Sequence, residues 1–227
     1  MTYPAQLYEL NIITDSPIFE GFALVDYLPS QLGQDSLEDD ITPGYLDAAE
    51  DLNWKQPRLS AVWPTPSVIG RVHPCNDFPG LDMALPAFSA RACKCLESFL
   101  LPNGELLPLN SKVGEYFFYN ITTIADVLNS QESVCEFWCD PPTTAVEIEH
   151  FAFDESKLGS LTIFRIPQFP MSAIVTDEFV DAVYANSLNG FEFTKIWPFE
   201  RGQKWREMNQ VLTAPRDLDA FVSSLDG

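Results

Sequence analysis

The sequence has few of the residues and motifs on which catalysis commonly depends. It contains two histidines, His73 and His150, and has no G-x-G-x-x-G, G-x-x-x-x-G-K-[ST], H-E-x-x-H or G-x-S-x-G motif. His150 follows two apolar residues on one face of an expected strand, which favours a satisfied core or boundary histidine over a catalytic base. His73 lies two residues from Cys75, but a nucleophile pair also needs a shaped pocket and a third orienting group. We therefore expect no catalytic residues.

Cysteines suited to metal binding and long apolar runs are also absent. The five cysteines are unevenly spaced, and neither Cys93 with Cys95 nor Cys135 with Cys139 has the C-x2-C spacing that tetrahedral zinc usually uses. No run approaches the roughly 18 apolar residues of a membrane span, and the N-terminal run lacks a basic start and contains Glu9. These absences predict a cytoplasmic protein with reduced, buried thiols, no bound metal and no cofactor.

Basic residues are scarce and unevenly placed. Lys and Arg number 13 against 33 acids, which gives a formal net charge of -20. Residues 1–54 contain eleven acids and no base, residues 113–156 contain nine acids and no base, and the tail brings Arg201, Lys204 and Arg206 together. A surface of this charge repels nucleic acid and anionic lipid and attracts cations and basic proteins. We expect a basic protein partner, with no nucleic acid and no membrane.

Apolar periodicity predicts strands at 3–13, 104–109, 115–121, 134–138 and 145–153, and a helix from Leu85 to Leu101. Residues 122–129 are expected to form a helical or turn insertion. In FAFDESKLGSLTIFRIP, Asp154 is placed to cap a short helical turn and Gly159 to end it. A strand apolar on both faces then follows over residues 161–166. A further strand at 173–177, a helix capped by Thr176 and Gly190, and a strand at 190–198 complete the pattern.

This order of elements predicts an α+β fold: a curved, mostly antiparallel sheet with helices packed on one face. We expect residues 1–84 to form an acidic, proline-rich N-terminal lobe packed on a main domain of residues 85–198. Residues 199–227 are expected to form a partly helical tail. Five prolines between residues 57 and 79 favour irregular backbone in the lobe, because each removes a donor from any strand ladder.

The predicted main domain resembles a known family, the Imm11 family of bacterial immunity proteins. The resemblance rests on the order and spacing of four blocks: FSARACKCLESFLLPNGELLPL, YFFYNITTIADVLN, HFAFDESKLGSLTIFRIPQFP and IVTDEFVDAVYANSLNGFEFTKIWP. It implies a non-enzymatic protein made beside a polymorphic toxin, which protects its producer by binding that toxin. The resemblance implies no catalytic residues.

Two other functions remain open from the sequence alone. The first is an acidic adaptor or nucleic-acid mimic whose partner is not a toxin. The second is a hydrolase that uses Glu147 and Glu149, which project from one face of an expected strand with Asp154 soon after, although a half-exposed strand has the same pattern.

The candidate partner-binding residues lie in or beside the acidic stretch of the N-terminal lobe. Seven carboxylates would attract a basic partner, and three aromatic residues would anchor it. They are Asp35, Glu38, Asp39, Asp40, Asp47, Glu50, Asp51, Tyr45, Trp54 and Trp63. Packing of the lobe on the main domain is an alternative role for each aromatic residue.

Overall fold

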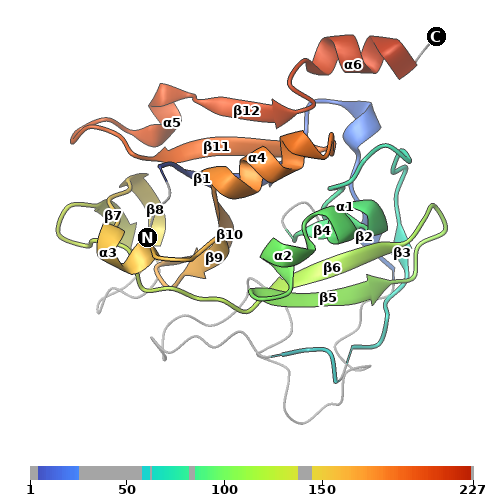
Figure 1. The fold of residues 1–227 in the computed structure, drawn as a ribbon, viewed down its shortest axis with the longest axis horizontal. Helices are drawn as coiled ribbons and strands as arrows, with labels where there is room; N and C mark the ends of the chain where they lie inside the picture. Colours follow the sequence, from blue (N-terminus) through green and yellow to red (C-terminus); the bar gives the residue numbers. More distant parts are fainter. Residues whose placement is uncertain (1–4, 26–57, 62, 82–84, 138–144, 226–227) are drawn as a thin grey trace.

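A computed structural model describes residues 5–25, 58–61, 63–81, 85–137 and 145–225 of the chain (Figure 1). Its largest element is a five-stranded antiparallel sheet in the order β12-β11-β1-β10-β9. Its strands are β1 (Leu7–Ile12), β9 (Ile163–Ile166), β10 (Phe169–Thr176), β11 (Phe191–Trp197) and β12 (Val211–Ala214). The predicted N-terminal strand is therefore the central strand of a sheet whose other members come from the last third of the chain.

The two neighbours of β1 pair with it over different lengths. β11 follows β1 from Leu7 to Ile12, whereas β10 pairs with it only from Leu7 to Glu9. Beyond Glu9, β1 and β10 separate. This separation creates a cavity that is described below.

The other described strands form three smaller sheets. One is a three-stranded sheet of β4 (Ala87–Ser89), β6 (Tyr116–Ile121) and β5 (Gly104–Leu109), in that order. The second pairs β7 (Val134–Phe137) with β8 (Ala145–His150), and the third pairs β2 (Ala23–Leu24) with β3 (Val68–Ile69). All of these pairings are antiparallel. The predicted α+β class with mostly antiparallel strands is confirmed, but the strands are divided among separate sheets. Figure 1 shows β7–β8 and β5–β6 at opposite sides of the five-stranded sheet.

The predicted helix over residues 85–101 is wrong in its first part. Residues 87–89 form β4, and two short helices follow, α1 (Ala90–Cys95) and α2 (Glu97–Leu100). The helix begins after Ser89 because this residue is extended and its hydroxyl accepts a hydrogen bond from the Ala92 amide.

Residues 122–129 contain no helix and make single bridges, from Ile124 to Arg165 and from Leu128 to Phe153.

The short helical turn after β8 agrees with its prediction. Asp154 accepts a hydrogen bond from the Ser156 amide at the start of α3 (Glu155–Leu158), and Gly159 ends it with φ 42°. By contrast, α4 (Asp177–Ala185) ends before the predicted Gly190. Gly190 has φ 94°, and a Cβ there would lie 2.1 Å from Asn76 Oδ1, so this position requires glycine because two loops meet. The remaining helical segments are η1 (Pro17–Phe19), α5 (Trp205–Met208) and α6 (Leu218–Leu225).

Two hydrophobic cores cover opposite faces of the five-stranded sheet. One contains Ile163 and side chains of α1, α4 and β6, and the other contains Phe164 and side chains of β8, α3 and α5. All four residues of β9 are buried because the strand contributes alternately to both cores. A third core joins β2, β3 and the β4-β6-β5 sheet.

None of the described helices is long and apolar enough to span a membrane.

Candidate partner-binding surfaces

Most of the predicted partner-binding residues lie outside the described part of the chain. They are Asp35, Glu38, Asp39, Asp40, Tyr45, Asp47, Glu50, Asp51 and Trp54. Their role in binding stays a prediction. The structure does show how the chain is held on either side of this stretch.

The two flanks of the acidic stretch are attached near β5 and β3. The Val25 amide donates to the carbonyl of Ser67, at 2.9 Å, immediately before β3. On the other side, the buried carboxylate of Glu105 accepts from the Leu59 amide at 2.7 Å, from the Ser60 hydroxyl at 2.6 Å and from the Asn120 side chain at 3.1 Å. Burial alone would raise the pKa of Glu105, but these hydrogen bonds together lower it. An ionised Glu105 thus holds Leu59 and Ser60 against β5.

Trp63 is held by contacts within the fold. Its ring stacks on Phe118 with centroids 5.4 Å apart, and its indole nitrogen donates to the carbonyl of Pro108 at 2.7 Å. These contacts give Trp63 a packing role, which was the alternative to an anchor role. Its contribution to partner binding stays a prediction.

The carboxylate pair on β8 is occupied by the basic tail. Lys204 lies 2.6 Å from Glu149, and Arg206 lies 3.3 Å from Glu147. Between them the buried Trp205 donates its indole hydrogen to the carbonyl of Ile148 at 2.6 Å. We conclude that this pair serves to hold α5 on β8, because each carboxylate already faces a cation.

Asp154, the third carboxylate of the hydrolase hypothesis, lies in structural contacts as well, and so does His150. Asp154 caps α3, and the hydrogen bonds from Ser156 lower the pKa of Asp154. His150 is buried, and its Nδ1 lies 2.9 Å from the carbonyl oxygen of Gln203, so Nδ1 carries the hydrogen. The interpretation of His150 as a satisfied core histidine is confirmed.

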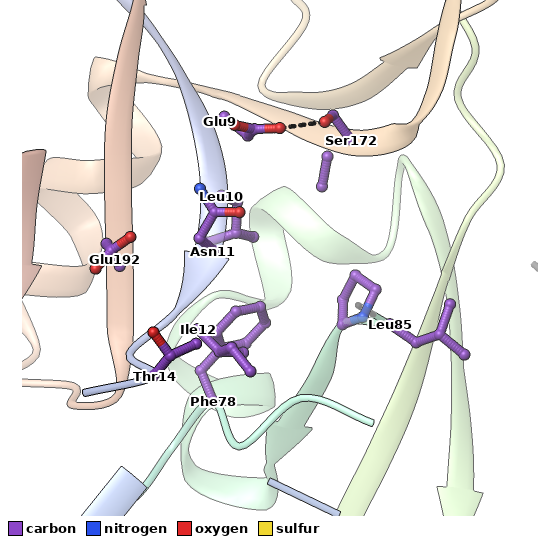
Figure 2. A pocket seen from close by; sticks show the side chains of 11 residues that line it. Glu9, Leu10, Asn11, Ile12, Thr14, Phe78, Leu85, Ser172 and Glu192 are labelled. Atoms are coloured by element: carbon purple, nitrogen blue, oxygen red, sulfur yellow. Dashed lines mark hydrogen bonds between the residues drawn. The ribbon is translucent and has the colours of Figure 1, made fainter. Parts of the chain in front are cut away.

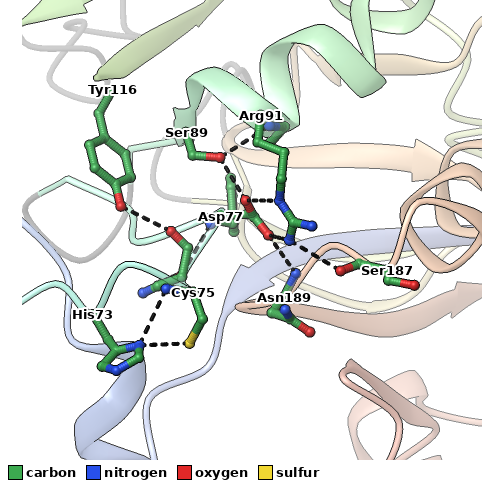
Figure 3. A network of polar contacts seen from close by, with 11 residues as sticks. His73, Cys75, Asp77, Ser89, Arg91, Tyr116, Ser187 and Asn189 are labelled. Carbon is green, nitrogen blue, oxygen red and sulfur yellow. Dashed lines mark hydrogen bonds and ion pairs between the residues drawn. The ribbon is translucent and has the colours of Figure 1, made fainter. Parts of the chain in front are cut away.

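A polar network ties the loop before β4 to the start of α1 and to the loop before β11 (Figure 3). The carboxylate of Asp77, whose side chain is 3% exposed, is its centre. It accepts hydrogen bonds from the Ser89 hydroxyl at 2.7 Å, from Nε and Nη2 of Arg91, and from the Asn189 amide at 3.0 Å. Arg91 also donates to the carbonyl of Ser187. This network could not be predicted from the sequence, because nothing near Asp77 in the sequence indicates its partners.

His73 and Cys75 are adjacent in the structure. Nδ1 of His73 lies 2.9 Å from Sγ of Cys75. Burial raises the pKa of the Cys75 thiol, whereas a nucleophilic cysteine needs a lowered pKa. Burial likewise raises the pKa of Cys93 to about 12. Within the described ranges the cysteines are free, and no group of three or more His, Cys, Asp and Glu side chains could hold a metal ion.

The separation of β1 from β10 opens a cavity of about 370 Å³ (Figure 2). Glu9 bridges the gap by accepting a hydrogen bond from the Ser172 hydroxyl. The cavity is lined by strands β1, β10 and β11 and by the chain around Phe78 and Leu85. No basic side chain is among its described lining residues. It combines the carboxylates of Glu9 and Glu192 with the buried apolar side chains of Leu10, Phe78 and Ala173.

Comparison with protein families matched part of this chain to a family of immunity proteins. Residues 107–197, from within β5 to the end of β11, match the sequence profile of the immunity protein family Imm11. The predicted resemblance is confirmed over these residues. The match suggests that the protein binds a cognate toxin and neutralises it without catalysis. A comparison with curated proteins gave no match.

Proposed function

We propose that this protein is a cytoplasmic immunity protein that neutralises a cognate basic toxin by binding it through an acidic surface. The match of residues 107–197 to an immunity protein family carries the proposal. The net charge of -20 supports the basic character of the toxin, since opposite charges steer encounter and exclude wrong partners.

The described ion pairs support this charge argument. Arg91, Lys157, Lys204 and Arg206 each face a carboxylate of the same chain, and Arg165 is buried. Lys195 and Arg216 lie over the rings of Phe199 and Tyr184. Much of the scarce positive charge is therefore paired with groups of the same chain. Among the residues that the structure describes, most carboxylates are exposed and available to a basic partner.

The first experiment identifies the partner genetically. Each reading frame beside the gene is expressed with and without this protein. We expect one product to become lethal when the protein is removed and harmless when it is restored. If no neighbouring product is lethal, the protein is not an immunity protein, and the acidic adaptor becomes the better hypothesis.

The second experiment tests the acidic stretch against a matched control. One variant neutralises Asp35, Glu38, Asp39, Asp40, Asp47, Glu50 and Asp51. The control neutralises the same number of exposed carboxylates elsewhere: Glu132, Glu136, Glu155, Glu178, Asp181, Glu207 and Asp219. The two variants have the same net charge, so only the position of the lost charges differs between them.

We expect the first variant to associate with the toxin more slowly than the control, with a weaker dependence on salt. Exposed charges act over a Debye length of about 8 Å at physiological salt, so charges near the interface dominate the association rate. Stopped-flow association rates over a range of salt concentrations measure this difference. Equal rates for the two variants would show that the acidic stretch is not the steering surface.

A further inference from the structure

The cavity between β1 and β10 is lined by two carboxylates, those of Glu9 and Glu192. In the register of β1 with β11, Glu192 lies opposite Asn11, which makes it a diagonal neighbour of Glu9, with the two residues about 7–8 Å apart. Burial raises the pKa of Glu192, and the charges of Asp15 and Glu9 raise it further. No described basic residue lines the cavity to offset these carboxylates.

The rest of the lining combines the polar side chains of Asn11, Thr14 and Ser172 with an apolar part. Leu10, Phe78 and Ala173 are buried in its walls, and Ile12 and Leu85 are partly exposed. Figure 2 shows Glu9 and Ser172 at one end of the cavity, and Ile12, Phe78 and Leu85 towards the other. Glu9 and Ile12 are three residues apart on β1, so their Cα atoms are about 10 Å apart along the strand.

This arrangement matches one kind of side chain. Lysine and arginine each carry a cation at the end of an apolar stem of methylene groups, and they bury that stem readily on apolar surface. Glu9 and Ile12 point to opposite faces of β1 because three residues separate them on the strand. With the stem against Ile12 and Leu85, the cation would pass through the gap between β1 and β10 to Glu9, and Glu192 is the next carboxylate on that face. An acidic side chain would be repelled by both, and a short polar one would leave the apolar part of the cavity unfilled.

We propose that this cavity binds a lysine or arginine side chain of the toxin as an anchor of the complex. The proposal rests on the proposed function and makes it more specific, because it places one contact at a defined site. Glu192, Ser172 and Ala173 come from the region that matches the immunity family, whereas β1, Phe78 and Leu85 lie outside it. The cavity therefore joins the region that matches the family to residues outside that match.

The first test needs no toxin. The full-length protein is titrated with the capped tripeptides Gly-Arg-Gly and Gly-Lys-Gly, and with Gly-norleucine-Gly as a neutral control of similar length. Binding is followed by backbone amide NMR signals. We expect the basic peptides to shift signals of β1, β10 and β11 in a saturable way, with norleucine binding much more weakly. Equal binding of all three peptides, or shifts confined to other regions, would overturn the proposal.

The second test uses the toxin identified by co-expression. The double variant Glu9→Gln with Glu192→Gln removes both charges and keeps an acceptor oxygen for Ser172. The control variant Glu155→Gln with Glu178→Gln removes two exposed charges from α3 and α4. We expect the first pair to weaken toxin affinity about tenfold or more, mainly through faster dissociation, and the control to change it little. Thermal unfolding checks that both variants fold.

The outcomes separate this inference from the proposed function. If the toxin binds both variants as tightly as it binds the unmodified protein, the cavity is not an anchor site, although the protein is still an immunity protein. If no toxin is found, the proposed function fails, and the peptide titration alone decides whether the cavity binds basic side chains.

Discussion

Replacing Asp77 should show how strongly one buried carboxylate holds this fold together. It accepts hydrogen bonds from Ser89, Arg91 and Asn189, and so links the loop before β4 to α1 and to the loop before β11. The two neutral donors contribute about 1 kcal/mol each, and the paired Arg91 about 1.5–3 kcal/mol. Half of the Arg91 side chain is exposed, and solvent screens its attraction to Asp77. The lower end of the range, about 1.5 kcal/mol, therefore applies to this pair. Asp77→Ala should therefore cost about 3–4 kcal/mol of unfolding free energy.

Urea unfolding followed by tryptophan fluorescence measures this loss. Asp181→Asn, an exposed carboxylate on α4, is the control and should change stability by less than about 0.5 kcal/mol. A double-mutant cycle with Arg91→Met should give a coupling energy of about 1–3 kcal/mol between Asp77 and Arg91. A loss below about 1 kcal/mol for Asp77→Ala, or a coupling energy near zero, would refute the assignment of Asp77 as the centre of the network.

Three further changes test other parts of the structure. Glu105→Gln should cost about 1–3 kcal/mol at pH 7. The pKa of Glu105 is lower in the folded protein, so its contribution to the free energy of unfolding is complete above the unfolded pKa of about 4.3 and is lost as the pH falls through the folded pKa. The urea midpoints of the variant and the unmodified protein should therefore converge in acid. Phe164→Ala, at a position with no exposure, should cost about 3–5 kcal/mol by the same assay, and a small loss would contradict its place in the second core. Trp205→Ala should release the tail from β8, seen as faster hydrogen exchange over residues 203–208, and unchanged protection would refute the role of Trp205.

The sequence predicted local structure well where one residue determines it. Asp154 and Gly159 define a short helix by themselves, and the apolar run around Ile163 and Phe164 indicates a strand buried on both faces. The helix predicted from Leu85 was wrong at its start because apolar residues at helical spacing also occur in a short strand followed by two short helices.

Long-range pairing could not be predicted in the same way. Nothing in residues 7–12 specifies that they pair with β10 and β11, more than 150 residues later in the sequence. The cavity follows from the point at which β10 leaves β1, and this point depends on the register of both strands. The ion pairs between the tail and Glu147 and Glu149 could be suspected from charge, but their geometry depends on the burial of Trp205.

The most direct test of the account is a titration of the toxin's activity with this protein. Neutralisation by binding predicts that residual activity falls linearly and reaches its minimum at one molecule of this protein per molecule of toxin, and that intact toxin is recovered when the complex is separated under denaturing conditions. Complete loss of toxin activity at a small fraction of that ratio, with chemically altered toxin, would show that the protein acts as an enzyme and would contradict the account.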